Sequence, residues 1–393
     1  MKVIEGNLVD IDNREFYPCT ITVSDGKILS IERNSNSYDH YICPGFIDAH
    51  VHIESSMLMP SEFSKLVIPN GTVGVVSDPH EIANVLGVEG VKMMIKNGEE
   101  TPLKIFWGIP SCVPATPLDK PGNIITAEDT EILAKTGQFT MLAEVMNIPG
   151  VLNGEPEVIA KLDIAKKYAL RIDGHAPELR GDALSAYITH GIETDHESSE
   201  LEEAEEKISK GMQIMIREGS AAKNYDALKS LIATRTDNVM FCTDDSHADD
   251  LLIKGHINYL VKKAVSDVMG LCAISHFRKR LLKNLSGGYQ QRVGIAQAII
   301  HKPDIVIFDE PTNGLDPNQI LDIRRLIKGI AEEHTVILST HILSEVQAIC
   351  DYIFMIDAGQ VVFTGSVNDF DNYILPSTIY VDFTEEIPGD KLK

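Results

Sequence analysis

The segment 44–56 reads PGFIDAHVHIESS, and it contains the pattern on which the fold prediction rests. Its apolar run, Phe46–His52, ends in His50 and His52, which are two residues apart. Side chains two residues apart on a β-strand point to the same side of the sheet, so both imidazoles can face one cation. A His-x-His pair on a half-buried strand is also common without a metal. The segment alone therefore leaves metal binding and an incidental pair both open.

Seven further apolar runs follow along the chain, and stretches with helical spacing separate them. These runs are Val73–Ser77, Lys104–Ile109, Phe139–Val145, Leu170–His175, Ile192–His196, Met212–Arg217 and Val239–Asp244. Near-continuous apolar runs are typical of buried parallel strands, and alternation with helices predicts a βα repeat. Eight such units predict an α/β protein with a (β/α)8 barrel, whose chemistry lies at the C-terminal ends of the strands. The spacing of apolar residues over Asp249–Val265 predicts the eighth helix.

The chain of 393 residues is long for one domain, and the pattern changes twice along it. Three parts are expected: half of a β-sandwich over residues 1–45, the barrel over 46–266, and a further α/β fragment over 267–393. In the first part, the turn Ser24-Asp25-Gly26 between two alternating runs predicts a hairpin. In the last part, a helical stretch from Asp267 to Ala298 precedes predicted strands at Ile305–Phe308, Val336–Ser339 and Tyr352–Ile356.

Ionisable side chains recur where the predicted barrel strands end. Besides the His-x-His pair, the ends of four other strands carry Glu144, His175, His196 and Asp244. Chance does not easily give four histidines and two carboxylates at matching positions. Imidazole and carboxylate groups suit one or two divalent cations. The sequence therefore predicts a metal site at the C-terminal ends of the strands.

These residues lie in segments that resemble the amidohydrolase superfamily, and more closely the bacterial type of adenine deaminase, over about residues 1–266. The matching segments are Pro44–Ser56, Asp78–Val85, Gly108–Pro114, Leu142–Asn147, Asp173–Pro177 and Gly191–Glu197. The segment His52-Ile53-Glu54 also fits the His-x-Glu of the zinc nucleobase deaminases. That family needs a Pro-Cys-x-x-Cys partner, which the chain lacks, so it is excluded.

The resemblance implies the deamination of a small-molecule substrate, adenine, to hypoxanthine and ammonia at a binuclear manganese or iron centre. The implied metal ligands are His50, His52, Glu144, His175, His196 and Asp244. A metal-activated hydroxide would attack C6 of the purine, and Asp244 would transfer the proton toward the departing ammonia. Glu81 is a candidate to hydrogen-bond or protonate the ring, or a carboxylate favoured by a helix N-terminus. Asp245 and His247 either orient ligands or are loop residues.

The last part, from about Asp267 to Val381, resembles the ATP-binding subunit of ABC transporters. Segment 285–292 matches the signature motif, and 305–310 an apolar strand that ends in two acids. The residues implied to contact ATP and magnesium are Ser286, Gly287, Gly288, Asp309, Glu310 and His341. The phosphate-binding loop Gly-x-x-x-x-Gly-Lys-Ser/Thr occurs nowhere in the printed chain. The ATP and magnesium motifs are therefore incomplete, and autonomous ATP hydrolysis is not expected.

Three functions follow from this pairing of motifs. The first is a deaminase whose activity is impaired because a different segment replaces the second half of the family. The second is an ABC transporter ATP-binding subunit with an unusual N-terminal fusion. The third is a non-functional hybrid of the two. The complete set of metal ligands favours the first.

Composition adds expectations about partners and location. A net charge of −23 argues against a nucleic-acid partner, because phosphate backbones require positive surfaces. No run approaches the roughly 18 apolar residues of a membrane span, and the N-terminus lacks the order of a signal peptide. Six scattered cysteines suit reduced thiols, so a cytoplasmic protein is expected. The oligomeric state is left open, with a homo-oligomer as one possibility.

Overall fold

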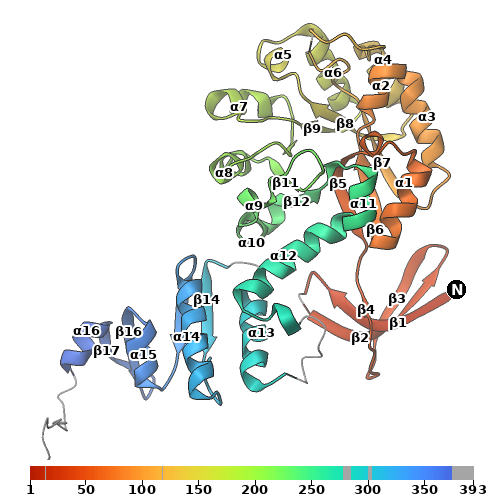
Figure 1. Ribbon diagram of the computed structural model, residues 1–393. Coiled ribbons are helices and arrows are strands. Elements are labelled where there is room, and N and C mark those ends of the chain that lie inside the picture. Colours follow the sequence, from red (N-terminus) through yellow and green to blue (C-terminus); the bar gives the residue numbers. More distant parts are fainter. Residues whose placement is uncertain (14, 117, 278–284, 300–302, 374–393) are drawn as a thin grey trace, which may run out of the picture. The chain divides into compact units, whose positions relative to one another are not determined.

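The computed structural model describes residues 1–13, 15–116, 118–277, 285–299 and 303–373 (Figure 1). The chain divides into two compact units, Met1–Ala264 and Val265–Lys393. No helix within the described ranges has both the length and the apolar character needed to cross a membrane.

The first unit begins with a four-stranded sheet in the order β3-β2-β1-β4. Its strands are β1 (Lys2–Asp10), β2 (Glu15–Ser24), β3 (Lys27–Arg33) and β4 (Tyr41–Ile42). Asp25 and Gly26 join β2 to β3 with φ values of 52° and 74°. A two-residue hairpin turn of this type needs positive φ at both positions, which Asp-Gly tolerates. The predicted hairpin is therefore confirmed.

The rest of this unit is built on parallel strands with helices around them (Figure 1). The strands are β5 (Phe46–His52), β6 (Thr72–Ser77), β7 (Lys104–Ile109), β8 (Phe139–Val145), β9 (Arg171–Gly174), β10 (Thr194–Asp195), β11 (Gln213–Arg217), β12 (Val239–Cys242) and β13 (Asp244–Asp245). They form a curled sheet in the order β13-β5-β6-β7-β8-β9 and a second sheet in the order β10-β11-β12. The predicted α/β architecture with a parallel sheet is thus confirmed.

A hydrogen bond connects the two sheets at one edge, and the chain itself connects them at the other. The backbone N–H of Glu193, just before β10, donates to the carbonyl oxygen of Ile172 in β9 at 3.0 Å. On the other side, β12 continues through Thr243 into β13, and Asp244 pairs with Val51 of β5. The strands consequently follow one another in chain order, and their C-terminal ends lie on one side.

Helices occupy most of the connections between these strands. They are α1 (Pro60–Val67), α2 (His80–Leu86), α3 (Val88–Gly98), α4 (Ala127–Lys135), α5 (Ile148–Leu152), α6 (Pro156–Lys167), α7 (Gly181–Thr189), α8 (Leu201–Ser209), α9 (Tyr225–Leu228), α10 (Leu231–Thr234), α11 (Ala248–Lys254) and α12 (Ile257–Leu271), with short 3₁₀ turns at Ile53–Ser56, Ile68–Asn70 and Thr236–Asn238. The prediction of one helix over Asp249–Val265 is wrong. Gly255, with φ of 95°, ends α11, and His256 turns inward to pair with Asp48 at 2.9 Å before α12 begins.

Strand alternation places the metal-site residues and the apolar core on opposite faces. Val51, between His50 and His52, is fully buried and belongs to the same apolar cluster as Phe63 of α1 and Ile109 of β7. Burial of this cluster against the helices fixes the orientation of β5, because a shift of one residue would exchange its faces. The two histidines therefore point away from the helices.

The second unit contains α13 (Gly287–Ile299), β14 (Ile305–Asp309), α14 (Pro317–Ala331), β15 (Thr335–Ser339), α15 (Leu343–Ile349), β16 (Tyr352–Asp357), β17 (Gln360–Ser366), α16 (Val367–Tyr373) and a 3₁₀ turn at Ser275–Phe277. β14 and β15 pair in parallel, and β16 and β17 form a hairpin. The predicted strands lie where the sequence placed them. The predicted helical stretch 267–298 is only partly helical, and its residues 278–284 lie outside the described ranges.

Candidate metal centre

The six predicted ligands come together at the C-terminal ends of the parallel strands. His50 and His52 end β5, Glu144 lies near the end of β8, and Asp244 begins β13. His175 and His196 follow β9 and β10 directly. Five of the six residues are buried, and the side chain of His175 is 25% exposed. Segments that lie far apart in the sequence therefore bring their ionisable groups into one buried cluster.

Glu144 lies at the centre of this cluster because each of its oxygens faces different histidines. Its Oε1 is 3.2 Å from His52 Nε2. Its Oε2 is 2.8 Å from His175 Nδ1 and 3.3 Å from His196 Nε2. A carboxylate in this position can bridge two neighbouring cations, one on each oxygen.

Asp244 faces the histidines with one oxygen. Its Oδ1 is 3.2 Å from His52 Nε2 and 3.6 Å from His50 Nε2. His50, His196 and Asp244 form one group of donor atoms within 4.8 Å of one another, and Glu144, His175 and His196 form another. The cluster therefore offers two adjoining sets of nitrogen and oxygen donors.

Hydrogen bonds on the outer nitrogens orient the two histidines of β5. His50 Nδ1 is 2.8 Å from Asp173 Oδ2, and His52 Nδ1 is 3.0 Å from the carbonyl oxygen of Asp78. Both acceptors favour a proton on Nδ1, which leaves a lone pair on each Nε2. The two Nε2 atoms are 3.1 Å apart. Two lone pairs directed at one place are the arrangement that a bound cation stabilises, so the residues fit a divalent metal.

The electrostatics of the cluster favour positive charge at its centre. Burial alone disfavours the charged forms, yet hydrogen bonds to the Asp244 and Glu144 carboxylates raise the pKa of His52 well above its ordinary value. The Glu144 carboxylate likewise raises the pKa of His196 to about 9. Hydrogen bonds from His175, His196 and His52 outweigh burial and hold the pKa of Glu144 well below its usual range.

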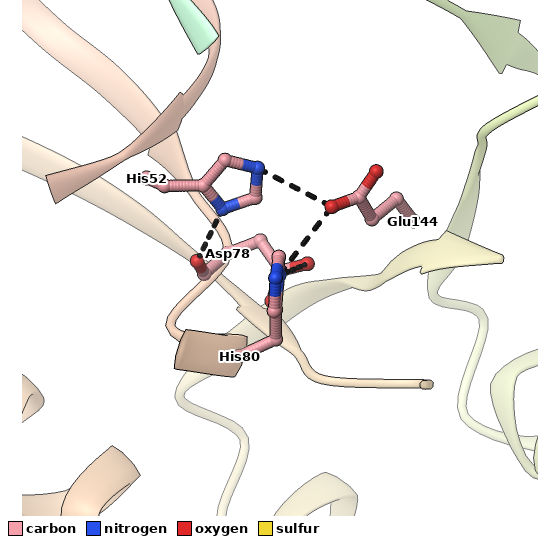
Figure 2. A group of neighbouring side chains, drawn as sticks. All are labelled: His52, Asp78, His80 and Glu144. Carbon is pink, nitrogen blue, oxygen red and sulfur yellow. Dashed lines mark hydrogen bonds and ion pairs between the residues drawn. The ribbon is translucent and has the colours of Figure 1, made fainter. Parts of the chain in front are cut away.

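Asp78 and His80 also belong to the cluster, although they are not among the six predicted ligands. Figure 2 shows His80 Nδ1 between Asp78 Oδ2, at 3.1 Å, and Glu144 Oε1, at 3.4 Å. Asp78, His80, Glu144 and His52 together form a further group of donor atoms. Asp78 Oδ1 is buried and has no hydrogen-bond partner in the described part of the chain. An acid and a histidine directly after β6 repeat the pattern found at the other strand ends, so the sequence did contain a signal for these two residues.

Arg217 and Glu197 are two more members of this region, and neither is among the predicted site residues. Arg217, the last residue of β11, contacts Glu197 through two bonds, Nη1–Oε1 at 2.5 Å and Nη2–Oε2 at 2.9 Å. Its Nη1 also donates to Asp244 Oδ2 at 2.6 Å. Burial opposes the charge, but the two carboxylates raise the pKa of Arg217 above its ordinary value. An arginine at the end of an apolar run gives no sign of these partners.

Asp245 belongs to a further group of possible ligands within the cluster, Glu81 lies beside it, and the two share one hydroxyl group. Ser55 Oγ is 2.7 Å from Glu81 Oε1 and 2.5 Å from Asp245 Oδ1. Glu81 lies in the first turn of α2, a position where the helix N-terminus also favours a carboxylate. His247 is exposed and precedes α11, where its backbone N–H donates to Ser220. This surface position favours the alternative that His247 is a loop residue and does not orient a ligand.

Of the predicted ATP-site residues of the second unit, Glu310 and His341 are in contact with each other. Asp309 Oδ1, at the end of β14, accepts from Ser339 Oγ at 2.8 Å, and Glu310 Oε1 is 2.7 Å from His341 Nδ1. Gly287 and Gly288 open α13, and Ser286 directly precedes it. The side chain of His341 is 73% exposed, in contrast to the metal-site histidines.

The sequence profile of the Amidohydrolase family matches residues 41–280. The chain belongs to the amidohydrolase family. This amidohydrolase is 51% identical over 277 residues to the adenine deaminase of Sulfurovum sp., which is 69% of this chain and 52% of the relative. It is also 51% identical over 263 residues to the adenine deaminase of Methanosarcina acetivorans, covering 67% and 48% of the two chains. The chain thus spans about half the length of the curated relatives it matches.

Solved structures similar to this amidohydrolase include ABC transporter proteins. CbiO1 of Clostridium perfringens, part of an ABC transporter complex, is 30% identical over 29% of this chain and 46% of its own, with a TM-score of 0.28. At this TM-score the likeness establishes no fold for the segment.

Proposed function

We propose that this amidohydrolase removes the amino group of adenine by metal-dependent hydrolysis and releases hypoxanthine and ammonia. The observation that carries the proposal is the position of Glu144, whose two oxygens face His52 on one side and His175 and His196 on the other. The names of the relatives support adenine as the substrate.

We further infer that the two parallel sheets are sections of one (β/α)8 barrel over residues 46–266, preceded by half of a β-sandwich over 1–45 and followed by an ABC-type fragment over 267–393. Within the barrel, the donor sets suit two cations, manganese or iron. The first would be held by His50, His52, Asp244 and Glu144, and the second by Glu144, His175 and His196. When bound, such cations lower the pKa of a water molecule from about 15.7 toward about 7.

The chain's own residues orient the reacting groups. Asp173 and the Asp78 carbonyl hold the β5 histidines so that each Nε2 faces the centre. Arg217 binds Asp244 Oδ2, so Oδ1 is the oxygen that faces the histidines. We assign to Oδ1 the transfer of the proton from the attacking water toward the departing ammonia. Glu81, oriented by Ser55, would hydrogen-bond or protonate the purine ring.

A metal-reconstitution assay tests this function. Protein stripped of metal with a chelator and reloaded with manganese should convert adenine to hypoxanthine. The double variant His50→Ala, His52→Ala should lose the activity, because both imidazoles of one donor set are removed. No turnover by the reloaded protein, or full turnover by the double variant, would contradict the proposal.

We propose that the activity is lower than in the longer relatives and that the second unit adds no ATPase activity. Exposed apolar residues on the first sheet, including Phe16, Ile28 and Leu29, support an incompletely covered β element. For the second unit, the printed sequence contains no phosphate-binding loop. Binding of magnesium–ATP at micromolar concentration would contradict this part of the proposal.

A further inference from the structure

Lys207 is a fully buried lysine of α8, the helix between β10 and β11. Glu203, one helical turn earlier, is buried as well, and its Oε1 accepts a hydrogen bond from Lys207 Nζ at 2.6 Å. A glutamate and a lysine four residues apart usually pair on the solvent-exposed face of a helix. This pair faces the inside of the protein, so the Lys207 ammonium must find its other partners there.

The other partners of Lys207 lie in two segments that carry metal-site histidines. Its Nζ donates to the carbonyl oxygen of Ala176 at 2.6 Å and to Asp195 Oδ2 at 3.0 Å. Ala176 directly follows His175 along the chain. Asp195 in turn directly precedes His196. The ammonium therefore joins the chain after β9 to the chain at the end of β10.

Asp195 strengthens this connection through both of its carboxylate oxygens. Its Oδ1 accepts from the backbone N–H of Ala176 at 2.8 Å, and its Oδ2 accepts from the backbone N–H and the hydroxyl of Ser198 at 2.9 and 2.6 Å. Ser198 Oγ also accepts from Lys207 Nζ at 3.0 Å. Both backbone polar groups of Ala176 are thus held, the N–H by Asp195 and the carbonyl by Lys207. All of these residues are fully buried, so the bonds are shielded from bulk solvent.

Charged hydrogen bonds of this kind fix direction more than they add stability. Replacement of a buried ion pair by apolar residues is often neutral, because the loss of hydration offsets the attraction. Hydrogen bonds to a charged group are nonetheless shorter and stronger than neutral ones, so they restrain the groups that they join. His175 and His196 need such restraint, because they follow different strands and approach one oxygen, Glu144 Oε2, at 2.8 and 3.3 Å.

We infer that Lys207 is a positioning residue, which joins the segments of His175 and His196 and so holds both imidazoles at the second cation of the proposed centre. The inference rests on the proposed function, which supplies the two-cation centre. Within the described ranges, the hydrogen bonds of Lys207 reach neither the β5 histidines nor Asp244, which would hold the first cation. Its removal should therefore affect the two cations unequally.

Manganese binding tests the inference without turnover. Full-length protein stripped of metal with a chelator would be titrated with manganese alone, and electron paramagnetic resonance would measure the free ion. The unmodified protein should bind two cations per chain. In Lys207→Met, which removes the ammonium but keeps an unbranched side chain, the first cation should bind as before and the second about 10- to 100-fold more weakly. A role in folding alone would weaken both cations or neither.

Lys161→Met is the matched control. Lys161 is a buried lysine of α6, and its Nζ donates to the carbonyl oxygen of Ser111, after β7, at 2.8 Å. This variant should bind both cations as the unmodified protein does, and denaturant unfolding would verify that all variants are folded. If Lys207→Met does not fold, Ser198→Ala replaces it. That variant removes one partner of the ammonium and should weaken the second cation about 5-fold, the effect of about one hydrogen bond.

The outcomes separate this inference from the proposed function. Unchanged affinity for the second cation in Lys207→Met, or in Ser198→Ala where it is used, would overturn the inference. An equal loss for both cations would also overturn it, as would the same selective loss in Lys161→Met. Binding of fewer than two cations by the unmodified protein would instead refute the two-cation centre of the proposed function, and the inference would fall with it.

Discussion

Two regions of the molecule place ionisable residues at the ends of parallel strands, and they differ in burial. In the first unit, Glu144 has a side chain that is 3% exposed and lies among histidines from other strands. In the second unit, Glu310 contacts His341 at a similar distance, but His341 is 73% exposed. Water screens the second pair, whereas a buried group must find compensation within the protein. Proximity alone therefore does not make a site; burial determines how strongly the groups act on one another.

The largest effect should come from Glu144→Ala. The substitution removes the carboxylate that faces His52, His175 and His196, so both proposed cation sites lose a ligand. We expect more than a 100-fold loss of deamination, since removal of even an outer partner of a metal ligand lowers metal affinity or activity by about 10- to 100-fold. Metal content by mass spectrometry should fall below that of the unmodified protein. Glu310→Ala, in the exposed region, should leave both quantities unchanged, and equal losses in the two variants would contradict the comparison.

Arg217→Met should mainly reduce stability. The variant leaves the buried Asp244 and the half-buried Glu197 without their guanidinium partner, and breaking a buried pair costs about 3–5 kcal/mol of unfolding free energy. Denaturant unfolding would measure the loss.

Arg180→Ala is the exposed counterpart, because Arg180 pairs with Glu200 at the surface. This substitution should lower the free energy of unfolding by less than about 1 kcal/mol. Similar losses of unfolding free energy in Arg217→Met and Arg180→Ala would show that burial does not distinguish these two sets of ion pairs.

Asp173→Ala should weaken metal binding without removing a ligand. Asp173 orients His50 through Nδ1, and loss of such a partner lowers metal affinity by about 10- to 100-fold. A competition titration with a chelating dye would measure this. Asp163→Ala, on the exposed face of α6, is the control and should not change the affinity. An unchanged affinity in Asp173→Ala would mean that the His50 contact does not support the metal site.

The smallest effect concerns pH in the second unit. The hydrogen bond to Glu310 raises the pKa of His341 above the ordinary value of 6.5. Because the folded-state pKa is raised, the stabilisation is complete below the unfolded value and disappears as pH rises through the folded value. Titration by nuclear magnetic resonance should place the midpoint of His341 above 6.5 and return it toward 6.5 in Glu310→Gln. A midpoint that does not respond to the substitution would exclude the pair in solution.

Much of the fold could be predicted because buried parallel strands have a distinctive sequence pattern. β5, β7 and β8 begin and end at the predicted residues, since each is a short apolar run beside polar segments. β10 contains only Thr194 and Asp195, so it is shorter than the predicted run Ile192–His196. The predicted eighth helix is interrupted at Gly255. These differences depend on hydrogen bonds with distant segments, which local pattern does not contain.

The ligand types at the strand ends could be read from the linear pattern, because a charged or imidazole side chain at the end of an apolar run stands out in the sequence. How these side chains pair depends on the folded arrangement of the strands. The curling of the sheet brings Asp173 to His50, Arg217 to Asp244 and His80 to Glu144. Such contacts join residues dozens of positions apart, and their geometry depends on how the strands curl and on which side chains share the buried interior.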